Sequence, residues 1–178
     1  EEFFGEDNWK YAERDRALEK KPVVDGEPSY EGIPQGLHNP RNGYWEEADA
    51  RRYAYWSVFG GAAGHTYGNN AVIQFYDGKS GPGAYGVRET WKEAPHYPGG
   101  GQMQYLKALM ETVDFTKGRP ADELLLFGQK ERHHRIAVFA GEEYIFCYDY
   151  MGDEFLLDLR AYQDKAMEIW WMNPQSGA

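Results

Sequence analysis

The sequence contains a single cysteine, Cys147, among 178 residues. One cysteine excludes a framework of internal disulfides and says little about the redox compartment. Long hydrophobic runs are also missing, because no apolar stretch approaches the roughly 18 residues that a membrane-spanning helix needs. We therefore expect no membrane insertion.

Basic residues are scarce, with 19 Lys and Arg against 29 Asp and Glu and a formal net charge of −10. Nucleic acid requires a basic footprint, and an anionic membrane surface attracts positive charge, so neither is expected as a partner. Aromatic residues, in contrast, make up 16% of the chain. Their faces attract the polarised C–H groups of sugars, so the composition favours a carbohydrate partner, although aromatic residues also fill strands and loops.

A short buried strand that runs into a carboxylate is predicted near the start of the chain. Val23 and Val24 are β-branched, and Pro28 ends the hydrogen-bonded ladder. Side chains alternate along a strand, so Asp25 and Glu27 point to the same side. Glu27 then lies at the carboxyl end of the strand, where a β/α barrel places catalytic groups. The alternative is an acidic turn after an edge strand.

The pattern predicts helices over about 8–20, 46–59 and 102–113, and a second buried strand over 62–67. A strand, a helix and a strand at this spacing form a βαβ unit, whose two strands should be parallel. The apolar stripe of the central helix consists of Tyr53, Trp56 and Phe59. A long glycine-rich loop precedes the last helix, and such loops are usually functional.

The hydrophobic period changes to two near His134, which predicts an antiparallel meander. Its four expected strands are 135–140, 143–151, 154–160 and 165–172. One face of the second strand carries the aromatic side chains Tyr144, Phe146, Tyr148 and Tyr150. The change of period predicts a separate, thin β domain with one open face.

Six separated motifs resemble, in the same order, those of the apiosidase-like glycoside hydrolases. They are Asp25–Glu31, Arg51–Phe59, Gly64–Gly68, Gln74–Tyr76, Thr90–Ala94 and Trp170–Pro174. The resemblance implies the C-terminal part of a (β/α)₈ TIM barrel over residues 1–126, followed by a partial antiparallel β-sandwich over 127–178. The strand ending at Glu27 would be the seventh of the barrel and 62–67 the eighth, with the other six expected upstream. It also implies a periplasmic or secreted bacterial protein.

The resemblance further implies a retaining glycoside hydrolase that acts on a branched plant cell-wall polysaccharide, such as an apiose-bearing pectin side chain. Glu27 would be the nucleophile, with Glu31 either its rival or a hydrogen-bonding neighbour. Asp25 would pair with a buried base or orient Glu27. The acid/base carboxyl would belong to a strand outside this chain, so we expect the chain alone to be inactive. The alternative is a carbohydrate-binding or scaffold protein that keeps the fold without the chemistry.

Further residues are candidates for contacts with the sugar. His65 and Tyr67 share one face of the second strand and can donate to the nucleophile or to a sugar hydroxyl, unless His65 is a satisfied core residue. His38 and Trp91 lie in loops, and Asn69 stands where relatives commonly carry histidine. No cofactor is expected. We also expect no metal, because the neighbouring His133 and His134 would point to opposite faces of a strand.

Overall fold

The computed structural model describes residues 7–19, 21–128 and 131–178. Its helices are α1 (Asn8–Leu18), α2 (Glu47–Phe59), α3 (Asn70–Ile73) and α4 (Pro98–Glu111). The strands are β1 (Val24–Asp25), β2 (Gly64–His65), β3 (Arg119–Pro120), β4 (Leu125–Phe127), β5 (Ile136–Ala140), β6 (Ile145–Asp149) and β7 (Leu156–Leu157). Short 3₁₀ turns occupy parts of the remaining chain.

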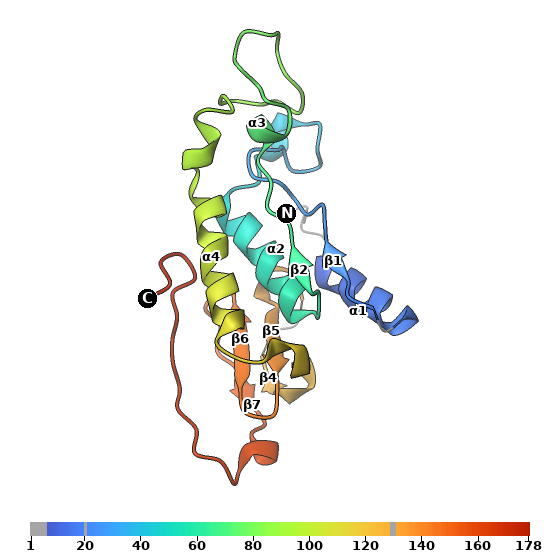
Figure 1. Cartoon of the computed structure of the whole chain (residues 1–178), viewed down its shortest axis with the longest axis vertical. Helices are drawn as coiled ribbons and strands as arrows, with labels where there is room; N and C mark the ends of the chain where they lie inside the picture. The colour runs from blue at the N-terminus through green and yellow to red at the C-terminus, as the bar shows by residue number, and fades with distance from the viewer. Residues whose placement is uncertain (1–6, 20, 129–130) are drawn as a thin grey trace.

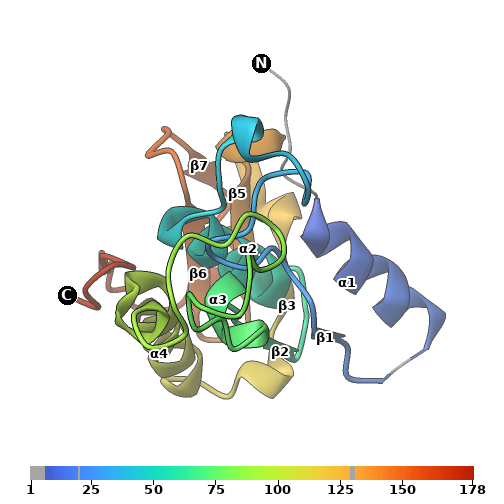
Figure 2. The ribbon, with the colours of Figure 1, turned by 90° about the horizontal axis from the view of Figure 1, so that it is seen from above.

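The chain forms an elongated body with α2 at its centre (Figure 1). The short helix α3 and the long loop that follows it lie at one end, and strands β4 to β7 lie at the other. Seen from above, α1 and α4 lie on opposite sides of α2 (Figure 2). The arrangement therefore mixes helices with small sheets.

Helix α2 is the most buried of the four helices, with nine of its 13 residues buried. Tyr53, Trp56 and Phe59 are each 2% exposed or less, as the sequence predicts. Glu46 and Asp49 form a capping box at its start, which satisfies amide groups that would otherwise lack partners. Phe59 packs with Leu106 and Met110 of α4 and with residues of β5 and β6 in one core cluster.

Strands β1 and β2 pair in parallel, with Val24 opposite Gly64 and Asp25 opposite His65. This confirms the predicted parallel pairing across α2. Each strand has only two residues, so the strands expected up to Glu27 and over 62–67 are shorter than predicted. The first strand is also not buried as predicted, because Val24 is 59% exposed. An isolated parallel bridge between Glu31 and Asn69 continues the pairing beyond the intervening turn.

The antiparallel strands form two small sheets, one in the order β3-β5-β6 and one of β4 with β7. Tyr148 lies in the core cluster, and Tyr144, Phe146 and Tyr150 pack against it, as the predicted common face requires. Strands β3 and β4 were not predicted. They precede the meander along the chain and pair with β5 and β7.

The prediction of a fourth strand over residues 165–172 is wrong. This segment has no strand assignment, and Ile169, Trp170 and Trp171 are each more than 80% exposed. A strand needs a hydrogen-bonding neighbour along its length, and a period-two sequence pattern cannot supply one. The segment instead runs alongside the body as an extended strap that returns toward α4 (Figure 1).

Helix α4 begins earlier than the predicted residue 102, at Pro98. Proline is well suited to the first helical position because its fixed φ matches the helix and its missing N–H is not needed there. Three glycines follow it within the first turn. Glycine disfavours helix formation, which is why the sequence pattern placed the start of α4 too late.

Candidate active site

Glu27 lies two residues beyond the end of β1 and is exposed. It lines a hollow of about 410 Å³ together with Tyr30, Trp45 and Tyr53. Burial raises the pKa of Tyr30, and the charges of Glu27 and Asp25 raise it further. The hollow therefore combines an accessible carboxylate with aromatic walls.

Asp25 forms one wall of this hollow and is fixed by two neutral donors. Its Oδ2 atom accepts a hydrogen bond of 3.0 Å from Asn8 Nδ2 and another from the Ser57 hydroxyl. Asn8 Nδ2 also lies 2.9 Å from the carbonyl oxygen of Tyr53. The network joins α1, β1 and α2, so it holds this wall of the hollow in place.

Glu31 has the opposite environment, because only 2% of its surface is exposed. Its backbone N–H donates to the carbonyl of Gly68 at 3.0 Å, and its carbonyl accepts from the N–H of Asn70 at 2.9 Å. The Tyr67 hydroxyl donates to Glu31 Oε2 at 2.5 Å. Both the backbone and the carboxylate of Glu31 therefore already have hydrogen-bond partners within the protein.

Burial is the main cause that raises the pKa of Glu31, and the charges of Glu47 and Glu89 act in the same direction. Hydrogen bonds from Tyr67 and from the backbone of Gly99 partly offset this effect. Burial also raises the pKa of Tyr67, and so does its bond to Glu31. The Tyr67 hydroxyl therefore stays protonated and acts as a hydrogen-bond donor to the Glu31 carboxylate.

Helix α4 begins directly against this pair. A Cβ atom added at Gly99 would lie 2.2 Å from Glu31 Oε2, and one at Gly100 would lie 3.0 Å from the Tyr67 ring. Only glycine leaves room for this close approach. The start of a helix carries partial positive charge, which favours a carboxylate at this position.

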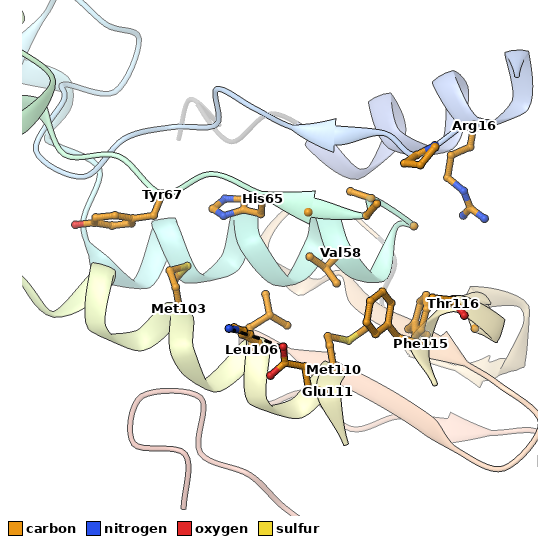
Figure 3. A pocket seen from close by; sticks show the side chains of 18 of the residues that line it. Arg16, Val58, His65, Tyr67, Met103, Leu106, Met110, Glu111, Phe115 and Thr116 are labelled. Carbon is orange, nitrogen blue, oxygen red and sulfur yellow. Dashed lines mark ion pairs between the residues drawn. The ribbon is translucent and has the colours of Figure 1, made fainter. Parts of the chain in front are cut away.

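His65 and Tyr67 both line a second, larger cavity of about 680 Å³. Figure 3 shows this cavity between β2 and α4, with Met103 and Leu106 on the facing helix. Burial lowers the pKa of His65, while the charge of Asp25 acts in the opposite direction. Tyr67 thus donates to Glu31 and not to Glu27, and His65 lies on the side of β2 that faces the helices.

The remaining predicted residues do not line the hollow at Glu27. Asn69 is 2% exposed, and its side-chain oxygen accepts from the Ala71 N–H at the start of α3. His38 is exposed and lies 5.7 Å from Tyr85 between ring centroids. Trp91 is 37% exposed and contacts the ring of Phe75. The loop residues are therefore open to solvent, whereas Asn69 caps a helix.

Sequence reasoning missed the roles of Asn8 and Ser57, which both donate to Asp25. Ser57 is a small, fully buried polar residue in the last turn of α2, next to the apolar residues Trp56 and Phe59, and a buried polar side chain in such a place signals a buried hydrogen bond. Phe75 carried no comparable signal.

Within the part of the chain that the structure describes, no three His, Cys, Asp or Glu side chains are grouped to hold a metal ion. His133 and His134 lie in a 3₁₀ turn rather than a strand, and His134 Nδ1 is 2.7 Å from Asp153 Oδ2. Among the same described residues, no helix is long and apolar enough to cross a membrane.

Comparison with protein families gave two matches along the chain. Residues 3–117 match the family described as apiosidase-like, catalytic domain, and residues 120–178 match the putative collagen-binding domain of a collagenase. The comparison with curated proteins gave no match.

The solved structures that are similar to this chain include two glycoside hydrolases. One is a glycoside hydrolase with 40% sequence identity and a TM-score of 0.88, and the match covers 97% of this chain and 39% of that one. The other is a glycoside hydrolase family 5 protein from Bacteroides vulgatus, with 41% identity and a TM-score of 0.83 over 87% of this chain and 34% of that one. The chain therefore spans well under half the length of these hydrolases.

Proposed function

Because the chain belongs to the apiosidase-like family of glycoside hydrolases, we propose that it is part of a retaining glycoside hydrolase with Glu27 as its nucleophile. The observation that carries the proposal is the position of Glu27: an accessible carboxylate at the carboxyl end of β1, in a hollow with aromatic walls. In this proposal β1 and β2 are the seventh and eighth strands of a TIM barrel, and a β-sandwich follows. The remaining strands come from a segment outside residues 1–178.

The proposed reaction proceeds in two steps. The Glu27 carboxylate attacks the anomeric carbon to form a glycosyl ester, while a second carboxyl group protonates the departing oxygen. That second group then takes a proton from water, which hydrolyses the ester and releases Glu27. Retention requires the two carboxyl groups to lie about 5–5.5 Å apart. We propose that the second group lies in the segment outside residues 1–178, so this chain alone would not catalyse the reaction.

The substrate we propose is a pectin-type plant cell-wall glycan, such as an apiose-bearing side chain. The family supports this class of substrate, and the partly exposed ring of Tyr30, which lines the same hollow as Glu27 and packs on the buried Trp45 and Tyr53, suits the apolar face of a sugar. Glu31 is assigned a supporting role, because its carboxylate is buried and already accepts from Tyr67.

The alternative function is a non-catalytic carbohydrate-binding or scaffold protein on the same fold. The match of residues 120–178 to a putative collagen-binding domain, together with the exposed Trp170 and Trp171, favours a binding role for the C-terminal part. Such a protein would bind the glycan without turnover, whatever residue stands at position 27.

The test compares Glu27→Gln with Glu31→Gln in the full-length protein that carries this chain. Glutamine keeps the shape of the side chain but cannot form the glycosyl ester. We expect Glu27→Gln to lower kcat by at least about 10⁴-fold and Glu31→Gln by about 10²–10³-fold, the size typical for loss of one hydrogen-bonding group.

Azide distinguishes the two roles further. It should restore turnover in a nucleophile variant and give a glycosyl azide of inverted configuration. Rescue of Glu31→Gln but not of Glu27→Gln would move the nucleophile to Glu31. Full activity in both variants would overturn the proposed site, and no turnover by the unmodified protein would favour the binding function.

A further inference from the structure

The segment that follows α3 holds two aromatic residues in strained backbone conformations. Phe75 has φ +48° and Tyr85 has φ +50°. Bulky side chains rarely adopt positive φ, and such strain persists only where the surroundings hold it. Strained residues of this kind cluster at ligand-binding positions.

Two side-chain amides hold this segment in place. Asn70, which is fully buried, donates through Nδ2 to the carbonyls of Gly32 at 2.8 Å and Tyr85 at 2.9 Å. Gln74 donates to Asn70 Oδ1 at 2.7 Å and accepts from the Ala84 N–H at 2.7 Å. The loop conformation is therefore fixed before any ligand arrives, which reduces the entropy cost of binding.

The strain directs an aromatic ring into solvent. Phe75 is 72% exposed and its ring lies 6.2 Å from that of Trp91 between centroids, at an interplanar angle of 61°. The backbone N–H of Trp91 donates to the backbone carbonyl of Tyr76 at 2.8 Å, which holds the backbone of Trp91 beside the segment that carries Phe75. Lys92 places its ammonium group 5.6 Å from the Trp91 ring centroid. An apolar pair is thus presented next to a hydrogen-bond donor.

We propose that Phe75 and Trp91 form a stacking platform for one sugar ring of a glycan, separate from the hollow at Glu27. The C–H face of a pyranose would stack on the more exposed Phe75 ring, the inclined Trp91 ring would contact the edge of the same sugar, and Lys92 would donate to its hydroxyl or carboxylate oxygens. The choice of a glycan as ligand rests on the proposed function. The fixed loop and the exposed rings stand independently of it.

Affinity electrophoresis of the full-length protein in gels containing soluble pectin, arabinogalactan or xylan tests the platform. We expect retardation by at least one of these, and about tenfold weaker binding in Phe75→Ala and in Trp91→Ala. Phe127→Ala is the matched control, because Phe127 is 63% exposed on β4. Absence of retardation for the unmodified protein, or equal loss in the control, would overturn the platform.

Phe75→Gly separates binding from packing. Glycine adopts positive φ without strain, so this variant should bind about tenfold more weakly while its Tm stays the same or rises. A fall in Tm of several degrees in both Phe75→Gly and Phe75→Ala would show that the ring packs against another part of the protein, and would overturn the platform.

The failure of this inference is distinguishable from failure of the proposed function. Loss of turnover in Glu27→Gln with binding unaffected by Phe75→Ala would leave the hydrolase standing and remove the platform. If Glu27→Gln retains turnover and Phe75→Ala weakens binding, the platform stands and the assignment of Glu27 as nucleophile fails.

Discussion

Glu27 and Glu31 are four residues apart, yet their surroundings are opposite. Glu27 stands in an open hollow, whereas Glu31 is covered, bonded to Tyr67 and placed at the start of α4. The comparison teaches that a carboxylate used for support has its oxygens already occupied, while one proposed to react keeps them accessible. Position along the chain does not distinguish the two roles.

Glu31→Ala should have the largest effect on stability. It removes the acceptor of the buried Tyr67 hydroxyl and leaves a void, so we expect a loss of about 2–4 kcal/mol in the free energy of unfolding. Urea denaturation of residues 1–178 measures this loss. Glu27→Ala is the matched control and should leave the free energy of unfolding nearly unchanged. Equal losses in both variants would erase the contrast between the two carboxylates.

Tyr67→Phe should have a smaller effect, about 1–2 kcal/mol at neutral pH, because it removes one hydrogen bond to a buried acceptor. Burial already raises the pKa of Glu31 in the folded state, and loss of this bond raises it further. When the pKa of a group is higher in the folded than in the unfolded state, its contribution to stability is fully present at pH values below the unfolded-state pKa. That contribution is lost as the pH rises through the folded-state pKa.

The destabilisation by Tyr67→Phe should therefore be greater at pH 8 than at pH 5. Urea denaturation at both pH values checks this, with Tyr30→Phe as the control outside the Glu31 pair. A pH-independent effect would indicate that Tyr67 contributes by packing alone.

Asp25→Asn should have the smallest effect, about 1 kcal/mol or less, because an amide oxygen can still accept from Asn8 or Ser57. Thermal melts compare it with Asp25→Ala, which removes both acceptor oxygens and should cost more. Equal losses in the two variants would mean that the charge of Asp25, which both variants remove, matters more to this wall of the hollow than the hydrogen bonds from Asn8 and Ser57.

The sequence predicted the parts of the fold that depend on local periodicity. The apolar stripe of α2 and the common aromatic face of β6 follow from spacing alone, and the parallel pairing of β1 with β2 follows from the βαβ order. Strand lengths and the strap over 165–172 were missed, because both depend on hydrogen-bonding neighbours distant in the sequence.

The candidate site was predictable only in part. A strand ending in Glu27 was visible as a pattern, but the burial of Glu31 depends on Tyr67 and Gly99, which are 36 and 68 residues further along the chain. No local signal reports such contacts. The positive φ of Phe75 is likewise imposed by the loop around it, and the residues next to Phe75 in the sequence do not predict it.

The glycines at the start of α4 have a consequence for the far end of the molecule. This helix of 14 residues, about 20 Å long, touches Glu31 at Gly99 and joins the core cluster with Phe139 and Tyr148 through Leu106 and Met110. A side chain at position 99 would collide with the Glu31 carboxylate, so either that carboxylate or the first turn of α4 must move, and a movement of α4 reaches the core cluster through Leu106 and Met110. Hydrogen exchange in β5 and β6 would therefore register a change made beside the buried carboxylate.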